Sequence, residues 1–237
     1  MPDGYNVAYG LEIAGERLIL VRAARRGVPQ TVCGVALDSE EARRALQGVS
    51  EEVEKGSAAL AVCAPAAKTV IRRLRAPFAS ISKASKVWAS LLDVDLPFPV
   101  EGALCFYGPA RIENGSTVSL AAAIRKSDLE AFDETCRGAG HEPTHCDAEA
   151  LALWDQHIAE APPARGDVSR VLVWLATDHV TVVRGRGGDF LAAHVLRASP
   201  LAEDDAGRQA FETLWAARSR QILTAHAAET GGGDVDL

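Results

Sequence analysis

The stretch that decides the fold runs from Pro65 to Glu101 and reads PAAKTVIRRLRAPFASISKASKVWASLLDVDLPFPVE. It contains two proline–phenylalanine corners, Pro77-Phe78 and Pro97-Phe98. A proline pushes the residue before it out of the helical region, so these corners bracket the segment between them. Ser80 or Ser82 can cap exposed backbone N–H groups at the start of a helix within that segment. The stretch therefore predicts a short helix held between two apolar corners.

The residues upstream of this stretch predict a sheet with one helix. Residues 58–64 form a continuous apolar run, as expected for a buried strand that rejoins the first sheet. A helix is predicted over about 38–46, where Ser39 can act as the N-cap. The chain begins with three β-rich runs that predict an antiparallel meander, at 5–13, 17–23 and 31–37. Within the stretch itself, residues 69–75 alternate apolar with basic side chains and are ambiguous between strand and helix.

The residues downstream of this stretch predict a hairpin, two helices and a linker, and then a repeat of the opening meander and helix. Asn114-Gly115 predicts a hairpin between strands at 100–107 and 116–124. Helices are predicted at 128–137 and 147–158, followed by an Ala-Pro linker at 161–166. The last part predicts three strands and one long helix, at 170–175, 179–184, 190–196 and 204–229.

This order of elements is a meander–helix–strand unit, an inserted block, and a second meander–helix unit. It predicts an α/β fold with α+β elements, of the duplicated actin-like or ribonuclease H-like type. We expect two lobes and an inserted α+β subdomain. The predicted domains are a first lobe at 1–65, the inserted subdomain at 66–160, a second lobe at 167–230 and a flexible tail at 231–237.

Composition excludes several classes of protein. The 237 residues are 48% hydrophobic and 24% charged, which is typical of a globular chain. A net charge of −7 disfavours nucleic acid as a partner. No apolar run approaches the ~20 residues of a membrane-spanning helix, and the N-terminus lacks the pattern of a signal peptide. The five cysteines contain no C-x-x-C motif and fit a reducing cytosol.

Residues 65–101 also carry a resemblance to a known family. Pro65 to Phe78 resembles the turn, arginine-bearing strand and Leu-x-x-Pro-Phe corner of the actin-like pilus-assembly protein PilM. It is also similar to the cytoplasmic domain of the type II secretion protein GspL. Residues 91–101 resemble the helix end and Pro-Phe-Pro corner that follow in this family, and weaker matches extend over about 8–200.

The resemblance implies a non-catalytic scaffold of a type IV pilus or type II secretion inner-membrane platform. Such a scaffold is cytoplasmic and associates with the inner membrane through its partners. The implied partners are the cytoplasmic tail of a bitopic membrane protein and the assembly ATPase, with a homodimer as a further state. In a GspL-type protein, a membrane helix would follow residue 237.

In this family, two turns hold the phosphates of a nucleotide, and both depart from the pattern here. The first reads Gly-Leu-Asp-Ile-Gly-Ser in the family, whereas Glu12 replaces the aspartate and Ala14 the second glycine in this chain. The second turn lacks its acid and its glycine at the expected positions before Asp178. We therefore expect no cofactor and no catalytic residues. Under the alternative, in which the protein binds or hydrolyses ATP with Mg²⁺, the cofactor would contact Gly10, Glu12, Gly15 and Asp178.

A basic cluster beside the proline corners is the candidate surface for a partner. It would bind an acidic partner or the anionic inner leaflet. The alternatives are a solvated strand face and purely structural corners. The residues assigned to partner binding are Arg72, Arg73, Arg75, Phe78, Pro97 and Phe98.

Two other interpretations remain open or are set aside. A homo-oligomer that assembles as actin does is a third functional alternative. His141 and His145 are metal-ligand types, but Pro143 between them prevents a shared helical face, so no metal site is predicted.

Overall fold

The computed structural model describes residues 5–14, 17–25, 27–138, 142–160, 168–176, 179–199, 204–230 and 235–236. The chain divides into two compact units. The first comprises Met1–Ala64 with Lys126–Ala148, and the second comprises Pro65–Arg125 with Glu149–Leu237.

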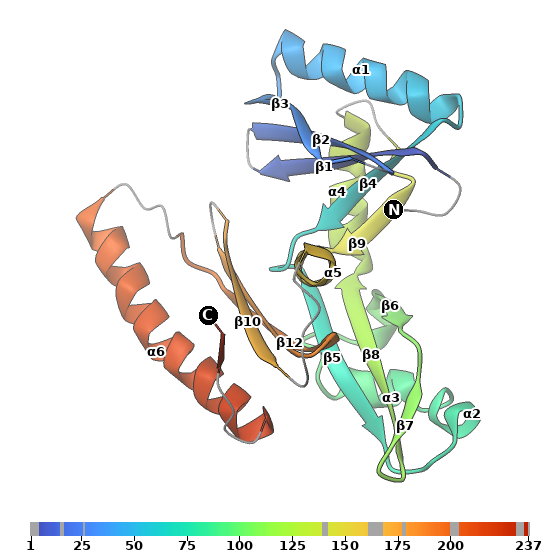
Figure 1. Ribbon diagram of the computed structural model, residues 1–237, viewed down its shortest axis with the longest axis vertical. Helices are drawn as coiled ribbons and strands as arrows, with labels where there is room; N and C mark the ends of the chain where they lie inside the picture. Colours follow the sequence, from blue (N-terminus) through green and yellow to red (C-terminus); the bar gives the residue numbers. More distant parts are fainter. Residues whose placement is uncertain are drawn as a thin grey trace. The chain divides into compact units, whose positions relative to one another are not determined.

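The first unit is a five-stranded sheet with two helices (Figure 1). The strand order is β3-β2-β1-β4-β9, in which β1, β2 and β3 form the predicted antiparallel meander. The apolar strand β4 pairs parallel with β1, as predicted, and β9 pairs parallel with β4. The elements are β1 (Val7–Ala14), β2 (Arg17–Ala24), β3 (Gln30–Ala36), α1 (Glu40–Glu54), β4 (Ala58–Ala64), α4 (Lys126–Gly138) and β9 (His145–Ala148).

Helix α1 is longer than the sequence predicted. Ser39 caps it, since its hydroxyl accepts a hydrogen bond from the Ala42 N–H at 3.1 Å. The helix continues to Glu54 rather than ending near Leu46, because its buried stripe extends through Val49 onto the sheet. Cys136 of α4 joins the same core, where burial raises its pKa to about 11.

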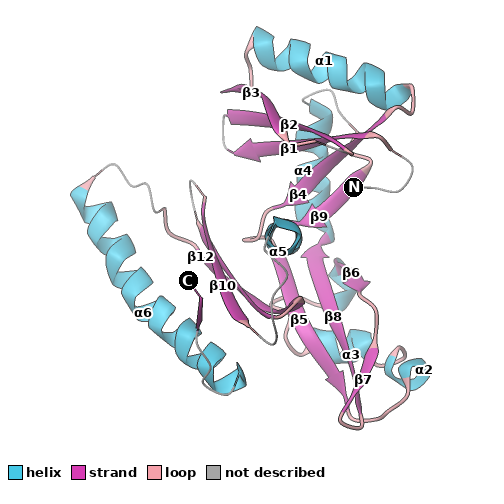
Figure 2. Ribbon diagram, viewed as in Figure 1, coloured by secondary structure: helices cyan, strands magenta, loops and turns pink. Residues whose placement is uncertain are grey.

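The second unit begins with a sheet whose main strands are in the order β5-β8-β6, and β7 also pairs with β8 (Figure 2). Residues 69–76, ambiguous in the sequence, form a strand, and the Asn-Gly hairpin is present, with φ of 48° at Asn114 and 77° at Gly115. The single helix predicted from Ser80 is instead two short helices, because the backbone turns between them at residues 85–87. The elements are β5 (Thr69–Ala76), α2 (Ile81–Ala84), α3 (Trp88–Asp93), η1 (Val100–Gly102), β6 (Ala103–Tyr107), β7 (Arg111–Glu113) and β8 (Ser116–Arg125).

The two faces of this sheet have different surroundings. One face packs on Trp88 and Leu92 of α3 through Leu74, Ala121 and Ala123. The strand register places on the opposite face the side chains that alternate with these, which include Arg73 and Arg75 of β5 and Leu104 and Phe106 of β6.

The rest of the second unit repeats the order of the first. Strands β10, β11 and β12 form an antiparallel meander, and α6 covers it through Ile222, Phe211 and Leu214. Val235 and Asp236 form strand β13, which pairs parallel with β10. The elements are α5 (Glu149–Glu160), β10 (Ser169–Leu175), β11 (Val180–Arg186), β12 (Asp189–Leu196), α6 (Asp205–Thr230) and β13 (Val235–Asp236).

The chain therefore contains the same β-β-β-α-β order twice, with the fourth strand parallel to the first in each copy. The duplicated β-β-β-α part of this unit was predicted from the sequence, whereas the parallel strand that completes the second copy was not. The compact units cut across the predicted domain boundaries, because β9 joins the first sheet whereas α5 contacts β11 and β12. The division into lobes and an inserted subdomain stays a prediction.

Candidate functional site

Two of the four residues predicted for a nucleotide lie within the described residues. Gly10 and Glu12 lie on β1, where Gly10 pairs with Val21 and Ala61 and the side chain of Glu12 is exposed. Gly15 and Asp178 lie outside the described residues. The nucleotide assignment therefore stays a prediction.

The three arginines of β5 do not share a face. Side chains alternate along a strand, so Arg73 and Arg75 point to one side of the sheet and Arg72 to the other. The guanidinium of Arg72 donates to the carbonyl of its neighbour Ile71 at 2.9 Å. Only two of the three arginines can therefore act together on one partner.

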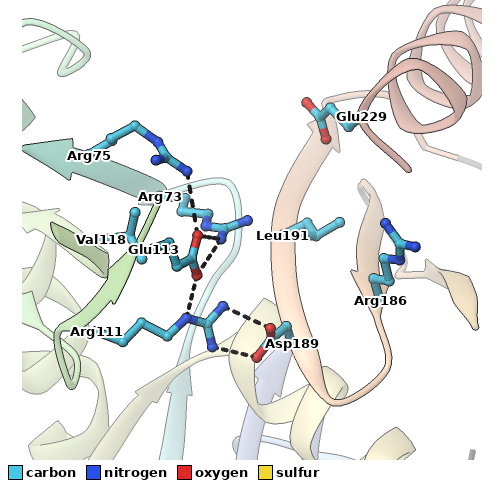
Figure 3. Close-up of a pocket in the computed structure, with 9 residues that line it drawn as sticks. All are labelled: Arg73, Arg75, Arg111, Glu113, Val118, Arg186, Asp189, Leu191 and Glu229. Carbon is cyan, nitrogen blue, oxygen red and sulfur yellow. Dashed lines mark hydrogen bonds and ion pairs between the residues drawn. The ribbon is translucent and has the colours of Figure 1, made fainter. Parts of the chain in front are cut away.

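Glu113 brings Arg73, Arg75 and Arg111 together (Figure 3). Arg73 Nη2 donates to both carboxylate oxygens of Glu113, at 2.8 and 2.7 Å, and Arg111 Nε donates to Oε1 at 2.6 Å. Arg75 makes one longer contact of 3.4 Å. Arg75 is therefore the arginine that Glu113 holds least closely.

A second carboxylate fixes the other side of Arg111. Asp189 accepts two parallel hydrogen bonds from the Arg111 guanidinium, at 2.7 and 2.8 Å. Such a bidentate pair sets the orientation of both groups as well as their separation. It ties β7 to the start of β12, which lies 78 residues further along the chain.

The arginines hold both carboxylates in the ionised form. Burial opposes the charge on Glu113, but the hydrogen bond from Arg111 and the charge of Arg73 outweigh it and lower the pKa of Glu113. The hydrogen bond from Arg111 also lowers the pKa of Asp189. Asp189 and Glu113 in turn raise the pKa of Arg111, so this network stays charged at neutral pH.

These residues line a hollow of about 530 Å³, which we call the arginine hollow. Figure 3 shows Arg73, Arg75, Arg111 and Glu113 on one side of it, and Leu191, Arg186 and Glu229 on the other. Its charged lining consists of four arginines and three carboxylates, namely Arg73, Arg75, Arg111, Arg186, Glu113, Asp189 and Glu229. Cationic groups therefore outnumber anionic ones in a protein whose net charge is −7.

The phenylalanine corners lie outside the lining of the arginine hollow. The Phe78 carbonyl accepts a hydrogen bond from Thr117 Oγ1 at 2.7 Å, and its ring packs on the α3 core. Phe98 lies 4.8 Å beneath the Arg125 guanidinium, a cation–π contact, and Pro97 beside it is exposed. The predicted partner residues thus separate into the Arg73–Arg75 pair, Arg72 on the opposite face, and the two corners.

Of the residues that line the hollow, only Arg73 and Arg75 were assigned to a site from the sequence. The ion-pair partners Arg111, Glu113 and Asp189 are among those that were missed. Arg111 and Glu113 flank the predicted Asn-Gly turn, so their closeness to β5 follows once the hairpin is paired. Nothing in the local sequence connects either residue with Asp189.

A separate buried cluster organises the start of α5. Glu149 Oε1 accepts from Thr181 Oγ1 and lies 3.1 Å from His179 Nε2, while Oε2 accepts from the Ala66 N–H at 3.0 Å. This carboxylate therefore joins α5, β11 and the turn before β5.

Among the described residues, no group of three or more His, Cys, Asp or Glu side chains is arranged to hold a metal ion. None of the described helices combines the length and apolar character needed to cross a membrane.

Known structures share this arrangement of elements. A chain of the PilM–PilN type IV pilus biogenesis complex is similar over 94% of this chain and 74% of its own, with a TM-score of 0.55 and 19% identity. The cytoplasmic domain of EpsL, an inner-membrane component of the type II secretion system of Vibrio cholerae, is similar over 84% of this chain and 76% of its own. That second match has a TM-score of 0.53 and 11% identity.

The chain shares their fold. The α/β, actin-like fold predicted from the sequence is confirmed, and so is the resemblance in fold to PilM and to a type II secretion cytoplasmic domain. No family model matches the sequence, and no curated protein matches it.

Proposed function

We propose that this protein is a non-catalytic scaffold of a type IV pilus or type II secretion inner-membrane platform. The observation that carries the proposal is the similarity in fold, over 94% of the chain, to a chain of the PilM–PilN complex. The proposed location is the cytoplasm, at the inner membrane, with attachment through a bitopic membrane protein. The assembly ATPase is a second proposed partner.

The degenerate phosphate turns favour a scaffold over an enzyme. Glu12 carries a longer side chain than the aspartate of the family pattern, and Ala14 carries a Cβ where backbone N–H groups would approach phosphate. The second turn differs at its acid and its glycine. A fold that keeps its shape without these groups is better suited to binding proteins than to transferring phosphate.

The arginine hollow is the proposed docking point for the tail of the membrane partner. Arg73 and Arg111 are held by ion pairs with Glu113 and Asp189 before a partner arrives, so these two side chains lose little entropy on binding. Arg75, whose side chain is 51% exposed and makes one 3.4 Å contact, can turn toward an incoming carboxylate. We therefore propose an acidic segment of the tail as the ligand.

Binding of the tail tests this proposal. The native protein is titrated with a labelled peptide of the cytoplasmic tail of the bitopic platform protein from the same genome. We expect Arg75→Glu to weaken binding at least about 10-fold, because a like charge then faces the peptide carboxylates. Arg72→Glu is the matched control, as it makes the same change three residues away on the opposite face.

The outcomes separate the candidate ligands. Equal loss in both variants would mean that overall charge, rather than the hollow, controls binding. Unchanged binding in both would place the dock elsewhere. Binding of the native protein to anionic vesicles without the peptide, lost in Arg75→Glu, would identify the membrane surface as the ligand instead.

A further inference from the structure

Strand β6 is an exposed sheet edge with apolar side chains. It lies at the end of its sheet beside β8, and no described strand pairs with its other edge (Figure 1). Natural proteins usually protect such edges with lysine, proline or a covering element. Strand β6 reads Ala-Leu-Cys-Phe-Tyr and contains none of these protective residues.

The backbone of β6 offers an ordered row of hydrogen-bonding groups. The Gly108 N–H donates to the Leu120 carbonyl at 2.8 Å, and the register continues with Phe106 opposite Ala122 and Leu104 opposite Ile124. In an antiparallel ladder, residues bonded to one neighbour alternate with residues whose polar groups point the other way. The N–H and C=O groups of Cys105 and Tyr107 therefore point toward the open edge.

The side chains of β6 leave an apolar strip beside this row. Leu104 is 54% exposed and Phe106 is 66% exposed, and both lie on the sheet face opposite α3. Cys105 and Tyr107 point to the other face and pack against the α3 core. A strand added to this edge would therefore gain main-chain hydrogen bonds and bury two large apolar side chains.

We infer that β6 pairs with β6 of a second copy of this chain, antiparallel, about a two-fold axis through Cys105. The sequence is self-complementary in that register. Leu104 of each copy faces Phe106 of the other, twice, and Ala103 faces Tyr107. Strand β6 has no charged residue, so self-pairing sets no like charges opposite one another. This gives an isologous dimer, and no residue of β6 lines the arginine hollow.

Mass against concentration is the first measurement. We expect sedimentation analysis of the native protein to show a reversible rise from 25.1 kDa toward twice that mass as the concentration increases from micromolar to near-millimolar. A native protein that stays at 25.1 kDa throughout would overturn the inference, and the edge would then be free for a different strand.

Charge exchange tests the register. Leu104→Glu/Phe106→Glu places glutamates opposite each other across the axis, and Leu104→Lys/Phe106→Lys does the same with lysines, so each variant alone should be monomeric. Mixed together, they set Glu opposite Lys at every position and should restore the dimer. Failure of the mixture to dimerise would overturn the proposed register, and a dimer of either variant alone would place the interface elsewhere.

Two controls keep the result specific. Val94→Glu adds a charge at another exposed apolar residue, 83% exposed and outside β6, and should leave dimerisation unchanged.

Cys105 provides a covalent check, because hydrogen-bonded antiparallel pairs bring Cα atoms to about 5.5 Å, within the range of a disulfide. In a Cys63→Ser/Cys146→Ser background, which removes the exposed cysteines, mild oxidation should give a cross-linked dimer that Cys105→Ala abolishes. A cross-link that persists in Cys105→Ala would count against the axis.

Discussion

Thr117 is a single buried hydroxyl that fixes the first proline–phenylalanine corner. It is fully buried, donates to the Phe78 carbonyl at 2.7 Å and accepts from the Ser80 N–H at 3.1 Å. Thr117→Val keeps the shape of the side chain but leaves both backbone groups without this partner. We expect a loss of about 1–3 kcal/mol in the free energy of unfolding, measured with urea. Thr117→Ser keeps the hydroxyl and should lose less; an equal loss in both would mean that the methyl group, not the hydrogen bonds, stabilises the corner.

Glu113 makes the stability of the second unit depend on pH. Its folded-state pKa is lowered, so ionised Glu113 stabilises the fold above its unfolded pKa of about 4.3, and this contribution is lost as pH falls through the folded value. Glu113→Gln should therefore be less stable than the native protein at pH 7, with the difference shrinking below about pH 4. Thermal unfolding of both proteins between these pH values measures it. A difference that stays constant with pH would show that the carboxylate charge is not the source.

At the residue scale, the sequence was enough to find the cluster of basic residues, but not to say which of its arginines lie on the same face of the sheet. Residue type alone does not distinguish Arg72, Arg73 and Arg75. Only the assignment of residues 69–76 to a strand places Arg73 and Arg75 on one face. The partner carboxylates could not be predicted, because Asp189 reaches Arg111 through tertiary packing rather than through any local pattern.

Gly185 is required where α5 crosses the β11–β12 hairpin. A Cβ at this position would lie 2.0 Å from Cη2 of Trp154 and 2.7 Å from the Asp189 carbonyl oxygen. The indole also packs edge-on against Phe190, and its N–H donates to the Gly188 carbonyl at 3.3 Å. Gly185→Ala should therefore displace the indole and lower the free energy of unfolding by about 1–3 kcal/mol.

The neighbouring glycine gives the matched control for this element. A Cβ on Gly188 would meet nothing within 4 Å, so Gly188→Ala should change stability little. Denaturant titrations of both variants, followed by Trp fluorescence, test the contact directly. Similar stabilities for the two alanine variants would mean that the indole moves aside at no cost.

Elements whose signal is local were predicted well. The Asn-Gly turn, the opening meander and the long helix α6 each depend on a few consecutive residues or on one periodic stripe. The helix predicted between the two corners was wrong as a single element, since hydrogen bonds at Lys86 and Val87 close turns instead of continuing the helix. Strand β13 was missed because two residues carry no periodicity, and only the parallel partner β10 defines them.

At the scale of the whole molecule, the duplicated element order was enough to predict the fold. What the sequence could not predict is which segments join which compact unit. Strand β9 belongs with the first sheet through pairing with β4, although some 80 residues separate them. Such long-range pairing is fixed by shared cores, and local patterns carry no information about it.

Nucleotide binding is the prediction that distinguishes a scaffold from an ATP-dependent protein of the same fold. If both phosphate turns have lost their chemistry, millimolar Mg-ATP should leave the unfolding temperature of the native protein unchanged. A nucleotide present at about 100 times its dissociation constant would stabilise the folded state by about 2.7 kcal/mol, which is an easily measured shift.

Glu12→Gln decides what a shift would mean, because Glu12 is the acid that replaces the aspartate of the first turn. A shift in the native protein that this variant abolishes would contradict the proposed absence of a cofactor and make Glu12 the metal-positioning acid. A shift of equal size in both proteins would show nucleotide bound without that carboxylate, as expected of a site that holds ATP but cannot direct hydrolysis. The unfolding temperature of each protein without nucleotide is the reference for its own shift, so a change in stability caused by the substitution itself is separated from nucleotide binding.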